Sequence, residues 1–217
     1  RLLNLSAHGV VTAPGGGLED WRRPLAQVRE MRGVTGAAPF VELQAMLSSD
    51  GRLKGVLLRG VDPALEGAVS EVGQHLLVGS LDALQPGSDA LLLGRLLAAR
   101  LQVGLGDTVS LLVPAGADGG TRLVPRMRRF TVVGLFEVGM EEQDGTLALT
   151  HLADAAAARG RPGEVSGLRL RFADLFAAPQ VTRSLAAALG PGYEARDWTG
   201  ENASYFRAVR IEKTMMT

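Results

Sequence analysis

The chain has 217 residues, of which 46% are hydrophobic and 21% charged, a composition typical of globular proteins. Lys plus Arg and Asp plus Glu each number 23, so the formal net charge is zero, which argues against a nucleic-acid partner because domains that bind nucleic acids are normally basic. The absence of cysteine excludes a disulfide framework and a thiolate metal site. The length fits one large domain or two small ones. No stretch reaches the roughly 18–20 uninterrupted apolar residues that a membrane helix needs.

The first sixty residues predict a strand, a helix and a hairpin, in that order. Residues 2–13 have the composition of a strand, and a helix follows that begins after Asp20 as its N-cap and ends at Gly33. One face of this helix is apolar and carries Leu18, Trp21, Leu25 and Val28. Asp50-Gly51, between two apolar runs, is a typical hairpin turn.

The end of the chain repeats this order of elements. Residues 164–174 alternate like a strand, 178–192 predict a helix that stops at Gly-Pro, and 193–198 predict a short strand. Thr199 is a candidate N-cap for a final helix, which has no Gly, Asn or Pro to end it. We therefore expect this last helix to continue into a segment beyond the sequence.

The central section has a different pattern, in which short strands are separated by Gly and Asp turns. Its one clear helix is predicted at 95–103, with Gly104 as the cap. The fold class predicted is α+β. One β-α-β subdomain is built from both chain ends, residues 1–73 and 153–217, and a mostly-β subdomain, residues 74–152, is inserted between them.

The residues show little that points to catalysis. His8, His75 and His151 are far apart and have no carboxylate at metal-ligand spacing, so each is better explained as a surface or strand-end residue. The acidic group around 137–144 is typical of a solvated loop between strands. A stand-alone enzyme would need a convergent set of titratable residues, and none can be assembled. We expect no catalytic residue, cofactor or metal.

One connection stands out by its length. Residues 113–130 separate two predicted strands, with prolines at both ends, glycines in the centre and arginines toward the second strand. This segment is either a plain hairpin loop or an extended arm that binds another protein, since long loops in compact domains are usually functional or disordered. The candidate partner-binding residues are Pro114, Thr121, Arg122, Leu123, Val124, Pro125, Arg126 and Arg128.

Several stretches resemble the periplasmic domain of the LolC/LolE family of lipoprotein-releasing permeases, which is related to the MacB-like periplasmic core domain. The most specific are Arg59-Gly60-Val61-Asp62-Pro63 and the run from Arg196 through Met216, and the likeness covers residue 34 to the end. The resemblance implies a "porter" subdomain formed by both ends and an inserted "sabre" subdomain, which agrees with the predicted division.

The resemblance also implies a function and a set of partners. It implies a permease subunit of an ABC transporter in the Gram-negative inner membrane, anchored by transmembrane helices on both sides of this domain. The partners implied are a lipoprotein substrate, a second permease subunit or copy, a LolD-type ATPase and the periplasmic carrier LolA. A MacB-type efflux permease is the alternative within transport.

For the arm, the resemblance implies a role as the hook with which LolC-type subunits capture LolA, whereas LolE-type subunits are thought to contact the lipoprotein. Val113-Pro114, Pro125, Arg128 and Phe130 fit the hook pattern, but Gly119-Gly120-Thr121 stands where a bulkier tip is expected. LolC-like, LolE-like and hybrid subunits all remain open from the sequence.

Because ATP hydrolysis is expected on a separate subunit and no phosphate-binding loop opens a helix, we predict that this domain binds no nucleotide. Calorimetric titration with ATP–Mg²⁺ should give no saturable heat. A site of micromolar affinity would contradict the prediction.

Overall fold

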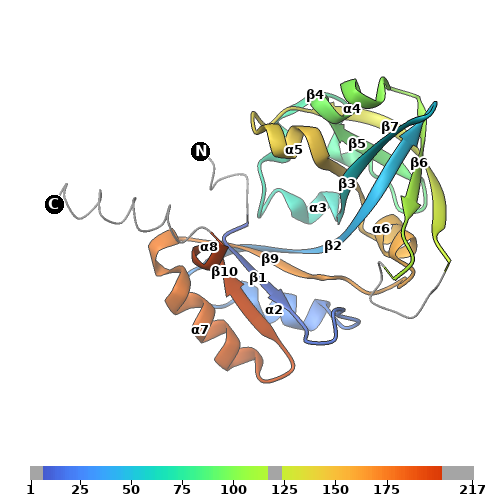
Figure 1. Ribbon diagram of the computed structural model, residues 1–217. Coiled ribbons are helices and arrows are strands. Elements are labelled where there is room, and N and C mark those ends of the chain that lie inside the picture. Colours follow the sequence, from blue (N-terminus) through green and yellow to red (C-terminus); the bar gives the residue numbers. More distant parts are fainter. Residues whose placement is uncertain (1–6, 117–123, 202–217) are drawn as a thin grey trace.

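The computed structural model describes residues 7–116 and 124–201 (Figure 1). The strands are β1 (Gly9–Thr12), β2 (Val34–Ser49), β3 (Arg52–Val61), β4 (Leu76–Val78), β5 (Ala90–Gly94), β6 (Thr108–Val113), β7 (Arg126–Phe136), β8 (Leu147–His151), β9 (Gly167–Phe172) and β10 (Glu194–Asp197). The helices are α2 (Arg22–Arg29), α3 (Pro63–Glu66), α4 (Arg95–Leu101), α5 (Glu141–Thr146), α6 (Leu152–Arg159), α7 (Ala178–Leu189) and α8 (Trp198–Glu201). Short 3₁₀ turns occupy Val72–Gln74, Leu81–Ala83 and Leu175–Ala177. The predicted α+β fold class is confirmed.

Six strands close into a barrel. β2 pairs with β3, β3 with β8, β8 with β5, β5 with β7, β7 with β6, and β6 returns to β2. Closure removes the exposed strand edges at which an open sheet can pair with other chains. The barrel is filled by inward-facing aliphatic and aromatic side chains, among them Leu47, Leu58, Leu91, Leu93, Leu111 and Phe130.

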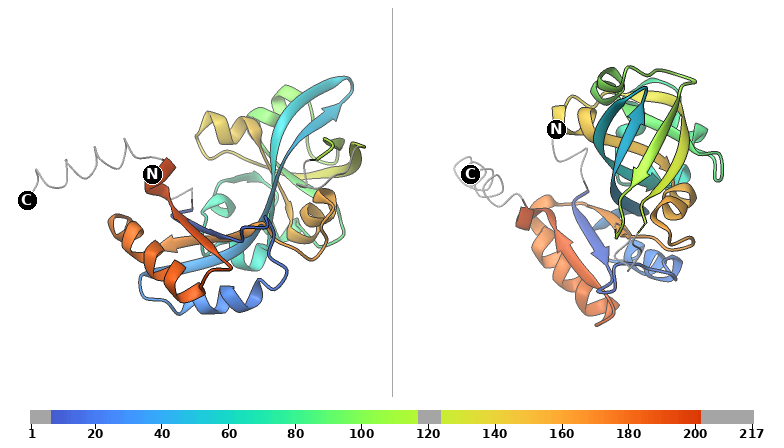
Figure 2. Two further views of the ribbon diagram at one scale, coloured as in Figure 1. Left: turned by 60° about the horizontal axis from the view of Figure 1, so that its bottom comes forward. Right: turned by 45° about the vertical axis from the view of Figure 1, so that its right-hand side comes forward.

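The remaining strands extend the sheet away from the barrel. The first half of β2 pairs with β9, β9 with β1, and β1 with β10, all antiparallel. α2 and α7 cover one face of this extension (Figures 1 and 2), and their apolar residues join the same core cluster as the barrel interior. β1 thus pairs with strands from the end of the chain and not with β6 or β7.

The predicted division into 1–73 plus 153–217 and 74–152 remains a proposal. The pairing shows how closely the two parts are joined, because the hairpin of β2 and β3, which that division assigns to the first part, supplies two of the six barrel strands. The hairpin turn itself forms at Asp50 and Gly51, as predicted, with φ values of 45° and 79°. These positive values are those of the turns that match the twist of a hairpin.

The predicted helices at 95–103 and 178–192 and all five central strands are present, but several local predictions were wrong. The first helix begins at Arg22, with Trp21 and not Asp20 as the N-cap, because Leu18 forms a β-bridge with Val165 and holds the chain extended up to that point. The helix cap predicted at Gly104 is instead Gln102, in the left-handed conformation with φ 56°.

Two further corrections concern polar residues. The acidic segment predicted as a solvated loop contains α5, and Asp144 is buried because its carboxylate accepts hydrogen bonds from the backbone N–H groups of Val138 and Gly139, at 2.8 and 3.0 Å. At the last described helix, Asp197 and not Thr199 accepts the capping bond, from the Thr199 N–H at 2.8 Å.

The segment Arg59–Pro63 has a structural role at each of four positions. Arg59 pairs with Glu42 across the hairpin, at 2.8 Å. A side chain on Gly60 would collide with Ala155, so glycine here lets α6 pack on β3. Asp62 caps α3 by accepting from the Ala64 N–H at 3.0 Å, and Pro63 occupies the first turn.

The short helix α3 places Glu66 inside the protein, where both of its oxygens accept hydrogen bonds from Arg169 of β9, at 3.0 and 2.7 Å. The two side chains are only 1% and 4% exposed, so each charge depends on the other for compensation. This ion pair ties α3 to the sheet extension.

We predict that Glu66→Gln lowers the free energy of unfolding by about 3 kcal/mol or more, because it leaves the Arg169 guanidinium buried without its counter-charge. Urea denaturation measures the effect. Asp20→Asn is the matched control: it breaks the Arg23–Asp20 pair, whose side chains are 75% and 74% exposed, and should cost well under about 1 kcal/mol. Equal losses in the two variants would contradict this account.

Candidate functional site

The predicted arm leaves the barrel from the hairpin of β6 and β7. The last cross-strand pair is Val113 with Arg126, so the connection covers 114–125. Of the candidate partner-binding residues in it, Pro114, Val124 and Pro125 are described and exposed. Thr121, Arg122 and Leu123 lie outside the described residues.

Arg126 lies at the base of the arm and is half-buried against α6. Its guanidinium occupies the space that a side chain on Gly160 would need, and Gly160, with φ 84°, is the C-cap of α6. Glycine is therefore required here both by the backbone conformation and by the approach of the arginine. A cation at the C-terminal end of a helix is also favoured by the helix dipole.

Arg128 is held by two carboxylates of the domain. Its Nε and Nη2 are each 2.8 Å from Oδ1 of Asp89, and its Nη2 is 3.9 Å from Oδ1 of the buried Asp154. Asp154 in turn accepts hydrogen bonds from the backbone N–H groups of Gly87 and Asp89, at 2.9 and 3.1 Å. Arg126 and Arg128 both lie on the inward side of β7, so we expect them to position the arm.

The outward side of the same strands carries a set of apolar side chains near the arm, which the sequence reasoning missed. Met127 pairs with Leu112 of β6, and Leu112 pairs with Met46 of β2, so the three side chains form a row across the outer face of the barrel, called here the apolar row. Met127 is 65% exposed, and Val124, three residues earlier in the chain, is 68% exposed. Large apolar side chains gathered at an exposed surface mark a candidate contact site for another molecule.

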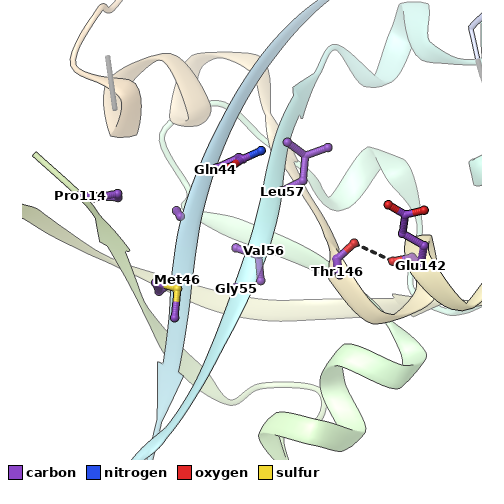
Figure 3. Close-up of a pocket in the computed structure, with 9 residues that line it drawn as sticks. Gln44, Met46, Gly55, Val56, Leu57, Pro114, Glu142 and Thr146 are labelled. Carbon is purple, nitrogen blue, oxygen red and sulfur yellow. Dashed lines mark hydrogen bonds between the residues drawn. The ribbon is translucent and has the colours of Figure 1, made fainter. Parts of the chain in front are cut away.

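A groove of about 490 Å³ lies beside the apolar row (Figure 3). Its walls come from the β2–β3 hairpin, from α5 and from the start of the arm, and its lining residues are Gln44, Ala45, Met46, Gly55, Val56, Leu57, Pro114, Glu142 and Thr146. Gly55 pairs with Met46, and the only atom within 4 Å of a Cβ added there would be the sulfur of Met46, at 3.9 Å. The missing side chain thus leaves the groove open next to the row.

In residues 7–116 and 124–201, no three His, Asp or Glu side chains gather as metal ligands. His8 is buried and accepts a hydrogen bond at Nδ1 from the Phe172 N–H, at 2.9 Å, and His151 caps α6 by accepting from the Ala153 N–H at 3.0 Å. Both histidines have structural roles at strand ends.

A family model described as the MacB-like periplasmic core domain matches residues 3–188. The chain belongs to that family. No helix within the described ranges is long and apolar enough to cross a membrane. The solved structures similar to this fold include the extracellular domain of the Gram-positive ABC-type transporter YknZ, with a TM-score of 0.56 and 10% identity over 87% of this chain and 98% of that one. The periplasmic region of MacB from Actinobacillus actinomycetemcomitans gives a TM-score of 0.55 and 10% identity over 93% and 94%.

Curated proteins with higher sequence identity to this chain are also known. The chain is 40% identical over its full length to the lipoprotein-releasing system transmembrane protein LolC of Xylella fastidiosa, and 39% identical to LolC of Neisseria meningitidis. Identity to the LolE protein of Haemophilus influenzae is 22%, again over the full length. The chain spans about half, 52%, of the LolC relatives it matches.

The ion pairs at the arm's base give a test of what holds the arm. Arg128→Gln should lower the free energy of unfolding by about 1 kcal/mol, because it leaves Asp89 and the buried Asp154 without their cation. Thermal denaturation of Arg129→Gln, an exposed neighbour on the outward side, is the matched control and should show almost no change. The reverse order of the two effects would contradict the assigned pairing.

Proposed function

We propose that this chain is the periplasmic domain of a lipoprotein-releasing ABC transporter permease, and that it docks a LolA-type carrier through the arm and the adjoining apolar row. The observation that carries the proposal is the row Met46–Leu112–Met127 beside the arm, half-buried at Met46 and Leu112 and exposed at Met127, in a chain 40% identical to a LolC protein along its whole length. The domain acts as a docking and relay element and has no catalytic role.

The proposal extends to the wider assembly. The full-length protein is a multi-pass protein of the Gram-negative inner membrane with this domain on the periplasmic face. A separate LolD-type subunit hydrolyses ATP, a partner permease subunit or second copy completes the membrane part, and the substrate is a lipoprotein. The higher identity to LolC than to LolE, 40% against 22%, favours a LolC-like subunit.

The geometry supports docking by a few apolar anchors on a rigid base. The barrel is closed by hydrogen bonds, and its inward side at the arm is fixed by the Arg128–Asp89 pair, so the outward side is presented in one orientation. Protein interfaces gain most of their affinity from a small number of buried side chains, with methionine among the enriched types. Val124 and Met127 meet that description only when a partner covers them.

A MacB-type efflux permease is the second reading, and it shares the fold. The similarity to the MacB structure and to the YknZ structure comes with only 10% sequence identity, so it supports the fold alone. The closer sequence relatives are named as lipoprotein-releasing proteins.

We predict that Val124→Ser combined with Met127→Ser weakens binding of a LolA-type carrier by well over tenfold, while the melting temperature of the domain is almost unchanged. Burying an aliphatic side chain contributes roughly 1.5–3 kcal/mol, and about 1.4 kcal/mol corresponds to tenfold in affinity. Surface plasmon resonance with the immobilised domain measures the effect.

Leu105→Ser is the matched control, because Leu105 is also an exposed aliphatic residue, 53% exposed, but precedes β6 at the end opposite the arm. It should leave carrier binding unchanged. If the double variant binds the carrier as well as the parent does, the docking surface lies elsewhere, and contact with the lipoprotein becomes the better role for this arm.

A further inference from the structure

A second cavity, of about 490 Å³, lies on the face of the sheet extension opposite the apolar core to which α2 and α7 contribute. Residues from the sheet extension, from the β2–β3 hairpin and from α5 and α6 line it. They are Ala7, Val10, Thr12, Phe40, Glu42, Arg59, Gln143, Arg159, Ser166, Arg169 and Arg196. The cavity shares no lining residue with the groove beside the arm.

The charges around this cavity are unbalanced. Four arginines reach it from four different elements: Arg59 from β3, Arg159 at the end of α6, Arg169 from β9 and Arg196 from β10. Among its described lining residues, Glu42 is the single acid. Glu66 does not line the cavity but forms an ion pair with Arg169. When Glu66 is counted as well, the four arginines still outnumber the two glutamates by two.

Strand register accounts for this gathering. Arg196 and Arg169 both stand opposite Val10 of β1, one on each side of it, so the two arginines lie in one row across the sheet. Arg59 stands opposite Glu42 where β2 enters the barrel. The sheet extension and the barrel thus bring their basic side chains to a common space.

Two of the arginines, Arg59 and Arg196, retain donors for a ligand. Arg59 uses Nε toward Glu42, at 2.8 Å, and its remaining N–H groups make no further hydrogen bond within the described ranges. Arg196 is exposed and forms no ion pair with any described residue. Arg159 donates to the hydroxyl of Ser166 and to the carbonyl of Gly16, both at 2.9 Å, which holds its side chain at the cavity wall.

The electrostatic setting favours an added negative charge. The pKa of Arg59 is lowered, first by burial and second by the nearby charge of Arg169, and Glu42 offsets only part of this. An anion in the cavity would relieve the repulsion between these guanidinium groups.

We propose that this cavity is a binding site for a small oxyanion ligand, a phosphate or a carboxylate group. The planar fork of guanidinium N–H groups matches both groups, and the hydroxyls of Thr12 and Ser166 and the amide of Gln143 add neutral hydrogen-bond partners at the wall. The volume lies in the range of small-molecule sites. This site is independent of the proposed docking of a carrier, since it uses neither the arm nor the apolar row.

The test is calorimetric titration of the 217-residue chain with sodium phosphate and, separately, with sodium acetate, at constant ionic strength made up with chloride. One anion or both should bind with a stoichiometry of one. Binding of phosphate alone identifies a phosphate ligand, and binding of acetate alone a carboxylate ligand. Arg196→Gln should weaken the binding about tenfold, as expected for a lost charged hydrogen bond.

Two further variants make the outcome specific. Arg183→Gln changes the same charge on α7, on the opposite side of the sheet extension, and should leave the affinity unchanged. Glu42→Gln removes the acid from the cavity and should tighten binding. No saturable binding of either anion, equal weakening by Arg196→Gln and Arg183→Gln, or weaker binding after Glu42→Gln would each overturn the proposal.

Discussion

The architecture depends on one strand, β2, which is hydrogen bonded to three others. Over its 16 residues it pairs with β9 near its start, with β3 from Phe40 onward and with β6 near its end. The first pairing builds the sheet extension, and the last closes the barrel. Because a strand's side chains alternate strictly between its two faces, these pairings also fix which side chains share a surface.

Both candidate sites follow from this constraint. Glu42, Gln44 and Met46 are two residues apart on β2 and therefore point to the same face. Glu42 belongs to the basic cavity, and Met46 belongs to the apolar row and lines the groove. One face of a single strand thus leads from a polar site at the junction of barrel and extension to an apolar site beside the arm.

The two surfaces suit different kinds of contact. The apolar row is open and stands next to an arm at the rim of a closed barrel, as a protein-docking surface requires. The cavity is lined mostly by polar and charged side chains, and its arginines are partly held by Glu42, Glu66 and Ser166. That degree of preorganisation reduces the entropy lost when a small ligand is bound.

The sequence alone predicted what local chemistry controls. The hairpin at Asp50-Gly51 follows from a turn that needs two positive φ angles, and the helix at 178–189 follows from apolar spacing that places Leu185 inward. The division into two subdomains and the docking arm were inferred from order, length and resemblance, and both remain proposals.

What the sequence could not show depends on contacts that each element makes outside its own residues. α5 contains Asp144 and Gly145, poor helix formers, but Asp144 bonds two backbone N–H groups of the preceding turn, and Gly145 leaves room for Arg100. The pairing of β6 with β2 joins segments about sixty residues apart. In the sequence, Met127 is one residue among several arginines. Only the strand register shows that it ends an apolar row.

The same is true of the arginines. In the sequence, Arg128 and Arg129 are equivalent members of a basic cluster, yet Arg128 is paired with Asp89 on the inward side, and Arg129 is exposed on the outward side. Likewise, Arg59, Arg159, Arg169 and Arg196 are scattered along the chain, and only the fold brings them around one cavity.

The outer face of the barrel beside the arm is the surface that we propose receives a carrier. Hydrogen–deuterium exchange of the domain, with and without a LolA-type carrier, tests this proposal. We expect new protection confined to β6, the first half of β7 and the second half of β2, with β1, β9 and β10 unchanged. Protection centred on β1 and β10, with none at β6 and β7, would contradict it.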